Sequence, residues 1–230
     1  MVAYIYDMKK TKKIIIILCV MVGLLFCACA INVKTIIDKT SDLMSVFFFA
    51  DANWGEVEVY CGQREKQFEY DGVSTSKVDY GIIKICFDEK LEQSTIDISF
   101  QVNEKKTNLT LEKNPFDQSY MIDIEKQISS NSVVKINILN SVYEEIIVDC
   151  QSKNWQITDK EALEIAGESL QQFMIENSKN NLDYECYLKV VHNVQDGKRL
   201  YFYTFSIKTN QHKNSGVVID VNTGEVLAKS

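Results

Sequence analysis

The segment Gly55-Glu-Val-Glu-Val-Tyr-Cys61 predicts a β-strand with one apolar face, because its valines and cysteine alternate with glutamate and tyrosine. The same pattern continues downstream as far as Cys150. Turn residues interrupt it at intervals of about 8–12 residues, a spacing typical of sandwiches and barrels. Further segments that read as short strands lie at 67–70, 83–87, 96–101, 109–111, 120–124, 133–139 and 143–148.

Residues 56–150 are therefore expected to form one antiparallel β domain. About seven or eight short strands in a domain of this size are typical of an immunoglobulin-like β-sandwich, and this is the architecture that we predict. The Cys-Trp-Cys pattern of true immunoglobulin domains is missing, so the prediction concerns the architecture alone.

The chain has seven cysteines, four of which follow the N-terminal segment. Cys61, Cys86 and Cys150 fall in or beside predicted strands, and Cys186 lies further on. Two interpretations stay open: a disulfide between two of the first three, or small buried apolar side chains. Their wide spacing, with only two histidines in the chain, does not match a zinc site.

Residues 31–55 precede the predicted strands and read as a linker with a short helix. Six apolar residues fall near helical spacing: Ile36, Ile37, Leu43, Met44, Phe47 and Phe48. The run Phe47–Phe49 also fits the beginning of a strand, and Asn53-Trp54-Gly55 reads as a turn. We interpret the apolar residues as core packing in preference to a membrane-surface or partner-binding segment.

Residues 1–30 have the pattern of a bacterial export signal. Four lysines within 9–13 precede the uncharged apolar run Ile14–Phe26. Three outcomes stay open: cleavage after Ala30, lipidation of Cys29, or an uncleaved anchor over Ile14–Val33, which is about long enough to span a bilayer. Each outcome places the rest of the chain outside the cytoplasm, either secreted or attached to the cell membrane through its N-terminus.

The charge of the chain argues against a nucleic-acid partner. The formal net charge is −7. Residues 1–13 carry four lysines and one aspartate, so residues 14–230 carry −10. Nucleic-acid affinity comes largely from lysine and arginine on phosphates, which an acidic chain does not offer.

Residues 151–230 predict a small domain with one helix and an antiparallel sheet, so the whole chain is expected to be mostly β with an α+β C-terminal part. Thr158 and Glu161 fit a capping box that begins a helix, which is expected to run to about Asn177. One face of this helix carries Leu163, Ala166, Leu170, Phe173 and Met174.

Four strands are expected after the helix. The first hairpin pairs Tyr184–Val194 with Leu200–Lys208 through Asp196-Gly197, and the second pairs Gly216–Val221 with Glu225–Ala228. Tyr201, Tyr203 and Phe205 lie on one strand face. We expect this stripe to pack beneath the helix, although aromatic stripes also bind peptides or sugars.

The segments ITDKEALEIAGESL (157–170) and GVVIDVNTGEVLAKS (216–230) resemble the PepSY and PepSY-like domains of secreted bacterial proteins. The resemblance covers roughly residues 156–230, and the polar loop Thr209–Gly216 departs from the family pattern. It implies a domain that binds or restrains peptidases, or that modulates neighbouring envelope proteins. It implies no catalytic residues.

No recognisable catalytic, cofactor-binding or metal-binding motif occurs in the sequence. His192 falls in a predicted strand and His212 in a polar loop, and neither accompanies a nucleophile motif. Asp220-x-Asn222-x-Gly224-Glu225 partly resembles a calcium loop but lacks the remaining ligands, so we predict a hairpin turn there.

These observations favour a non-catalytic exported envelope protein that acts as a binding or regulatory module. Its expected partners are the cell membrane, through the N-terminus, and an envelope protein or a peptidase. Two alternatives remain. The first is a peptidase inhibitor or modulator that acts through the PepSY-like part, and the second is a hydrolase with a cross-strand pair of carboxylates.

Overall fold

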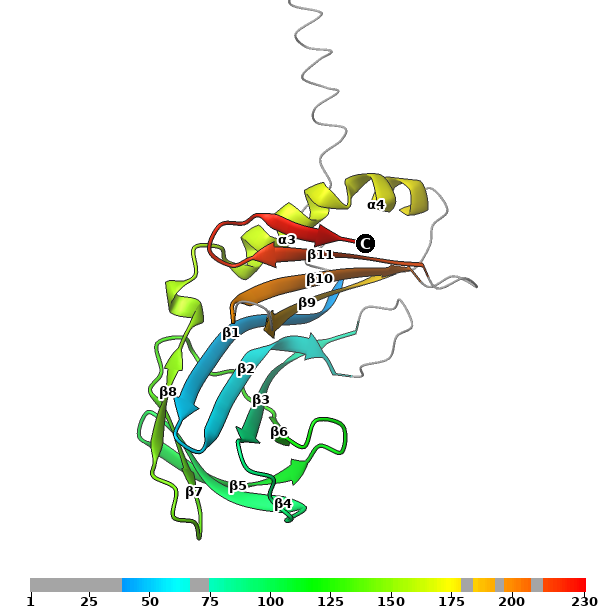
Figure 1. The fold of residues 1–230 in the computed structure, drawn as a ribbon. Helices are drawn as coiled ribbons and strands as arrows, with labels where there is room; N and C mark the ends of the chain where they lie inside the picture. The colour runs from blue at the N-terminus through cyan, green and yellow to red at the C-terminus, as the bar shows by residue number, and fades with distance from the viewer. Residues whose placement is uncertain (1–38, 67–74, 179–183, 193–196, 208–212) are drawn as a thin grey trace, which may run out of the picture.

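The computed structural model describes residues 39–66, 75–178, 184–192, 197–207 and 213–230. Its twelve strands form one continuous sheet in the order β12-β11-β10-β9-β1-β2-β3-β6-β5-β4-β7-β8 (Figure 1). The strands are β1 (Thr40–Ala52), β2 (Gly55–Glu65), β3 (Lys77–Phe87), β4 (Thr95–Val102), β5 (Lys105–Lys113), β6 (Tyr120–Ile124), β7 (Val134–Ile138), β8 (Ile146–Cys150), β9 (Tyr184–His192), β10 (Arg199–Ile207), β11 (Lys213–Asp220) and β12 (Val226–Lys229).

Strands β1 to β8 close into an eight-stranded antiparallel barrel. Closure comes from β1, which pairs with β2 on one side and with β8 on the other, where Phe48 is opposite Cys150. The predicted immunoglobulin-like sandwich is therefore wrong. Strands with alternating apolar and polar residues are compatible with a sandwich and with a barrel. Which of the two forms depends on the pairing of β1 with β8, which are far apart in the sequence.

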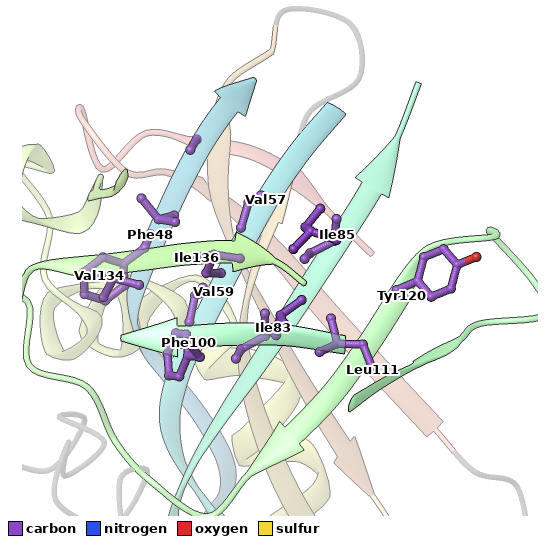
Figure 2. Packing of buried hydrophobic residues seen from close by; sticks show 14 of the residues in the cluster. Phe48, Val57, Val59, Ile83, Ile85, Phe100, Leu111, Tyr120, Val134 and Ile136 are labelled. Carbon is purple, nitrogen blue, oxygen red and sulfur yellow. The ribbon is translucent and has the colours of Figure 1, made fainter. Parts of the chain in front are cut away.

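Side chains fill the interior of the barrel, as Figure 2 shows. Alternate residues of the strands point inward, as the alternation predicts, except where the register of β1 shifts between Met44 and Val46. The largest members include Phe48, Ile83, Ile98 and Leu111, each with 0% exposure. The interior is thus a packed hydrophobic core.

The C-terminal strands β9 to β12 extend this same sheet from β1, because Leu43 of β1 pairs with Leu188 of β9 in parallel. The expected fold, a sandwich followed by a helix with its own antiparallel sheet, is therefore wrong, because the C-terminal strands belong to the sheet of the barrel. Helix α3 (Asp159–Ser169) packs against one face of the extension, and Tyr201 and Tyr203 are fully buried in the cluster beneath it, as predicted.

The helical region begins as predicted but contains two helices. The Thr158 side chain accepts from the backbone N–H of Glu161, and the Glu161 carboxylate accepts from the backbone N–H of Thr158, so the capping box is confirmed. The chain leaves helical geometry at Leu170, and α4 (Gln171–Ser178) follows. A short 3₁₀ turn, η1 (Ser152–Asn154), connects the barrel to this region.

Strand β1 belongs to two hydrophobic cores at once. Phe47 and Phe48 are both 0% exposed, yet Phe47 lies in the core beneath the helix and Phe48 lies inside the barrel. The helix expected within residues 31–55 is wrong over Thr40–Ala52, because neighbouring phenylalanines that face opposite cores require a strand. Residues 53 and 54 form the predicted turn into β2.

A buried ion pair joins the outer face of the barrel to β10. Arg199 Nη2 lies 2.8 Å from Glu58 Oε1, and both side chains are less than 10% exposed. The guanidinium stacks over the rings of Phe47 and Phe49, at 4.7 and 5.0 Å from their centroids. Lys84 Nζ lies 3.9 Å from the second oxygen of Glu58. This desolvated cluster fixes how β10 sits on the barrel.

A second polar contact lies at the start of β1. The Tyr80 hydroxyl donates to Asp42 at 2.6 Å, and Lys189 of β9 forms an ion pair with the other oxygen of Asp42. Burial, followed by the charge of Asp42 and this hydrogen bond, raises the pKa of Tyr80 well above its ordinary value. Tyr80 therefore stays a neutral donor across the physiological pH range.

We predict that Phe48→Ala lowers the free energy of unfolding by about 3–5 kcal/mol, because it leaves a cavity in the closed barrel. The matched control is Phe116→Ala, because Phe116 is 95% exposed and its truncation is expected to change stability by less than about 0.5 kcal/mol. Urea unfolding followed by tryptophan fluorescence measures both values. Equal losses in the free energy of unfolding for the two variants would contradict the placement of Phe48 in the barrel core.

We predict that Arg199→Met destabilises the protein by about 3–5 kcal/mol, because Glu58 stays buried without its closest partner. Adding Glu58→Met removes the orphaned charge and is expected to restore most of that loss. Chemical unfolding of the two variants provides the comparison. The prediction is wrong if the double variant is no more stable than the single one.

Candidate binding site

Four connections of the barrel meet at one of its ends. Consecutive strands β1–β2, β3–β4, β5–β6 and β7–β8 are joined there, because antiparallel neighbours reverse direction at the same end. We call this region the loop end and define it as residues 53–54, 88–94, 114–119 and 139–145. Helix α3 and strands β10 to β12 lie away from it, at the top of Figure 1.

An aromatic cluster closes the barrel beneath the loop end. Phe87 is central: its ring centroid lies 5.4 Å from Trp54, 5.6 Å from Tyr143 and 5.7 Å from Tyr120. The Phe87–Tyr120 pair is edge-to-face, a favourable arrangement for aromatic rings. These rings come from separate strands and loops, so the cluster holds the loops together and forms the floor of the site.

The β3–β4 loop is held across this floor by hydrogen bonds at both of its ends. The Asp88 backbone N–H donates to the Trp54 carbonyl at 3.2 Å, and the Tyr120 hydroxyl donates to the Gln93 carbonyl at 2.6 Å. Between them, Lys113 Nζ donates to the Leu91 carbonyl. A loop fixed in this way presents its side chains in a set arrangement, which lowers the entropic cost of binding.

Two hollows open on either side of this loop and share Phe87 and Leu91 in their walls. The larger has a volume of about 370 Å³ and lies under the β7–β8 loop. The smaller, of about 210 Å³, lies against the β5–β6 loop. Volumes of this size accommodate individual side chains of a partner.

Two large apolar side chains stand out from the loops beside these hollows. Phe116 and Val142 are each 95% exposed. Val142 lines the larger hollow, and Asp117, the neighbour of Phe116, lines the smaller one. Single exposed apolar residues are common, but two on loops at the same barrel end, one of them lining a hollow, mark a surface suited to binding.

The loop end is also acidic. Its four segments contain one basic residue, Lys90, and six acidic residues: Asp88, Glu89, Glu92, Asp117, Glu144 and Glu145. Asp117 pairs with Lys84 at 3.2 Å, and Glu145 pairs with Lys135 at 3.4 Å. Burial opposes ionisation of Asp117, but hydrogen bonds from Ser119 and Lys84 outweigh it and lower its pKa.

The residues weighed earlier for catalysis or metal binding do not come together. His192 is exposed at the end of β9, and His212 and the lipidation candidate Cys29 fall outside the described residues. Asp220 accepts from the backbone N–H groups of Asn222 and Thr223 at 2.7 and 3.0 Å, which confirms a hairpin turn. Among the described residues, no group of three or more His, Cys, Asp or Glu side chains is placed to hold a metal.

The four cysteines of the body are free thiols. Cys61 and Cys186 are buried, and burial raises their pKa values to about 11 and about 12. A high thiol pKa disfavours the reactive thiolate. Cys61 and Cys186 therefore fit the interpretation as small buried apolar side chains. Within the described part of the chain, no helix has the length and apolar character needed to cross a membrane.

No family model, curated protein or solved structure matches this chain. The candidate site is therefore identified from the geometry of the structure alone. Sequence reasoning placed the turns of the loop end but did not single out this site. The one available signal was an apolar residue inside each of two polar turns, Phe116 and Val142.

We predict that Asp117→Asn lowers stability at pH 7 by about 0.2–1 kcal/mol, the range for an exposed pair. The pKa of Asp117 is lowered by folding, so its contribution is present above about pH 4, the ordinary range of an aspartate, and is lost as the pH falls further. Chemical unfolding of the unchanged protein and of the variant at pH values between 7 and 2.5 measures the difference in their free energies of unfolding.

Ser119→Ala removes another donor to the same carboxylate, at 2.6 Å, and is expected to give a loss with the same pH dependence. A stability difference that stays constant down to pH 2.5 in both variants would show that the ionised Asp117 contributes nothing.

Proposed function

We propose that this protein is a non-catalytic binding module and that the loop end is its ligand site. The observation that carries the proposal is the 95% exposure of Phe116 and Val142 beside the two hollows. Burial of these side chains against a partner removes apolar surface from water, the main favourable term in association. The hydrogen bonds and stacked rings beneath them keep the surface preformed.

The module acts at the cell envelope, attached or released through its N-terminal export segment. The direction of β1 supports this arrangement. Thr40 begins β1 at the barrel end opposite the loop end, and Ala52 ends it beside the Trp54 turn. A chain tethered upstream of β1 therefore leaves the loop end directed away from the tether and accessible to a partner.

The proposal is tested by panning a random dodecapeptide library on the immobilised full chain. Peptides specific for this protein are expected to emerge, and Val142→Ser or Phe116→Ser should weaken their binding about tenfold, the value of one buried apolar side chain. The matched control is Val133→Ser, because Val133 is 51% exposed just before β7, at the opposite barrel end.

Titration by fluorescence anisotropy gives the dissociation constants for each variant. The proposal fails if no peptide is enriched over the blank surface. It also fails if the enriched peptides bind the two loop-end variants as tightly as the unchanged chain.

A second candidate, modulation of a peptidase, is favoured by the exposure of β12. This strand is last in the sheet order, and all four of its side chains are exposed, including Val226 and Leu227. Extended segments of this kind pair with the edge of a partner's sheet or enter clefts that take extended peptides. The test is dose-dependent inhibition of serine, cysteine and metallopeptidases by the full chain, relieved by Leu227→Asp. Absence of inhibition across all three classes excludes this candidate.

A further inference from the structure

We infer that the ligand of the loop end is a cationic, amphipathic polypeptide segment, in which lysine or arginine alternates closely with aromatic or large aliphatic residues. The inference rests on the proposed function of this site. It commits to the partner's chemistry because the loop end is acidic and its two hollows have different linings.

Most of the carboxylates at the loop end have no ion-pair partner among the described residues. Of the six acidic residues at the loop end, Asp117 and Glu145 have lysine partners. The remaining four form no ion pair with any residue that the structure describes, and their side chains are exposed: Asp88, Glu89, Glu92 and Glu144. A partner with basic groups therefore meets carboxylates that are not yet neutralised.

The connections at the two ends of the barrel differ in charge. The described connections at the opposite end, residues 66, 75–76, 103–104 and 125–133, carry Lys66 and Lys126 against Glu104 and Glu125. Over the described connections, the barrel is thus negative at the loop end and balanced in charge at the other. A cationic segment is therefore attracted more strongly to the loop end than to the opposite end, while nucleic acids and anionic membrane surfaces are repelled from the loop end.

The two hollows differ in the number of charged residues that line them. The larger has apolar and aromatic residues in its wall, among them Phe87, Ile96 and Tyr143, which can contact an apolar side chain. Its polar lining consists of Gln93, Thr95, Asp97, Asn140 and Ser141. The smaller is lined by Asp88, Glu89 and Asp117 and suits a basic side chain, although Lys90 and Lys113 also line it. Lys113 is already engaged with the Leu91 carbonyl.

The hollows are neighbours, since Phe87 and Leu91 line both. One short segment can therefore fill both, with an apolar and a basic residue only a few positions apart. Val142, which lines the larger hollow, and Phe116, the neighbour of Asp117 in the smaller one, are each 95% exposed and can cover the apolar face of that segment. Exposed carboxylates around buried apolar contacts give the polar rim and apolar centre of a typical interface.

The test begins with the peptides that panning of the random dodecapeptide library selects on the full chain. No positive charge is designed into these peptides. Their lysine and arginine content is expected to exceed that of the unselected library. A cationic peptide is then titrated against Glu89→Gln/Glu144→Gln, which removes two loop-end charges, and against the matched double variant Glu104→Gln/Glu125→Gln at the other end.

The loop-end pair is expected to weaken binding by roughly two- to thirty-fold, with a smaller dependence of affinity on salt, because each exposed charge contributes modestly. The control pair is expected to leave the affinity unchanged. Equal weakening by both pairs would mean attraction to net charge alone and would overturn the inference.

The outcomes separate the inference from the proposed function. Selected peptides without an excess of basic residues, whose binding is nevertheless lost in Phe116→Ser, overturn the cationic partner and leave the binding module intact. A library that yields no peptide overturns both. Basic peptides sensitive to Phe116→Ser and to the loop-end charges support both.

Discussion

The structure depends on the hydrogen bonding of β1 to three other strands. It pairs with β2 along nearly its whole length, with β9 at its first residues and with β8 near its end. The pairing with β8 closes the barrel, and the pairing with β9 attaches the C-terminal strands. Loss of either would open the barrel or leave β9 with an unpaired edge, so one strand holds the two parts of the sheet together.

A register shift between Met44 and Val46 lets β1 serve both sets of partners. The extra residue bends the strand where its pairing partners change, as bulges commonly do. Gly62 lies opposite this shift, and a Cβ there would be 1.9 Å from the Leu43 carbonyl oxygen. Only glycine allows the two backbones to approach this closely.

The division into two cores follows from the alternation of β1. Phe47 and Phe48 send neighbouring side chains to opposite faces, one beneath α3 and one into the barrel. The outer face of the barrel is therefore also the floor of the second core. The Glu58–Arg199 pair lies at this junction, where the stacking of Arg199 on Phe47 and Phe49 offsets part of the cost of removing the two charges from water. The barrel is filled by side chains and its strands are closed on each other, so the binding site that we propose lies in the loops at its end.

Local chemistry in the sequence was sufficient for much of the secondary structure. The alternation at Gly55–Cys61, the capping box of Thr158 and Glu161, and the turn closed by Gly224, whose φ is +72°, all depend on neighbouring residues and were predicted. The closure of the barrel and the strand at Thr40–Ala52 were not, because each depends on pairing between segments far apart in the chain. The loop end was likewise hidden, since its rings, carboxylates and hollows come from four separate connections. Periodicity encodes which face of a strand is buried, but only tertiary structure decides which strands become neighbours, because one alternating pattern is compatible with many pairings.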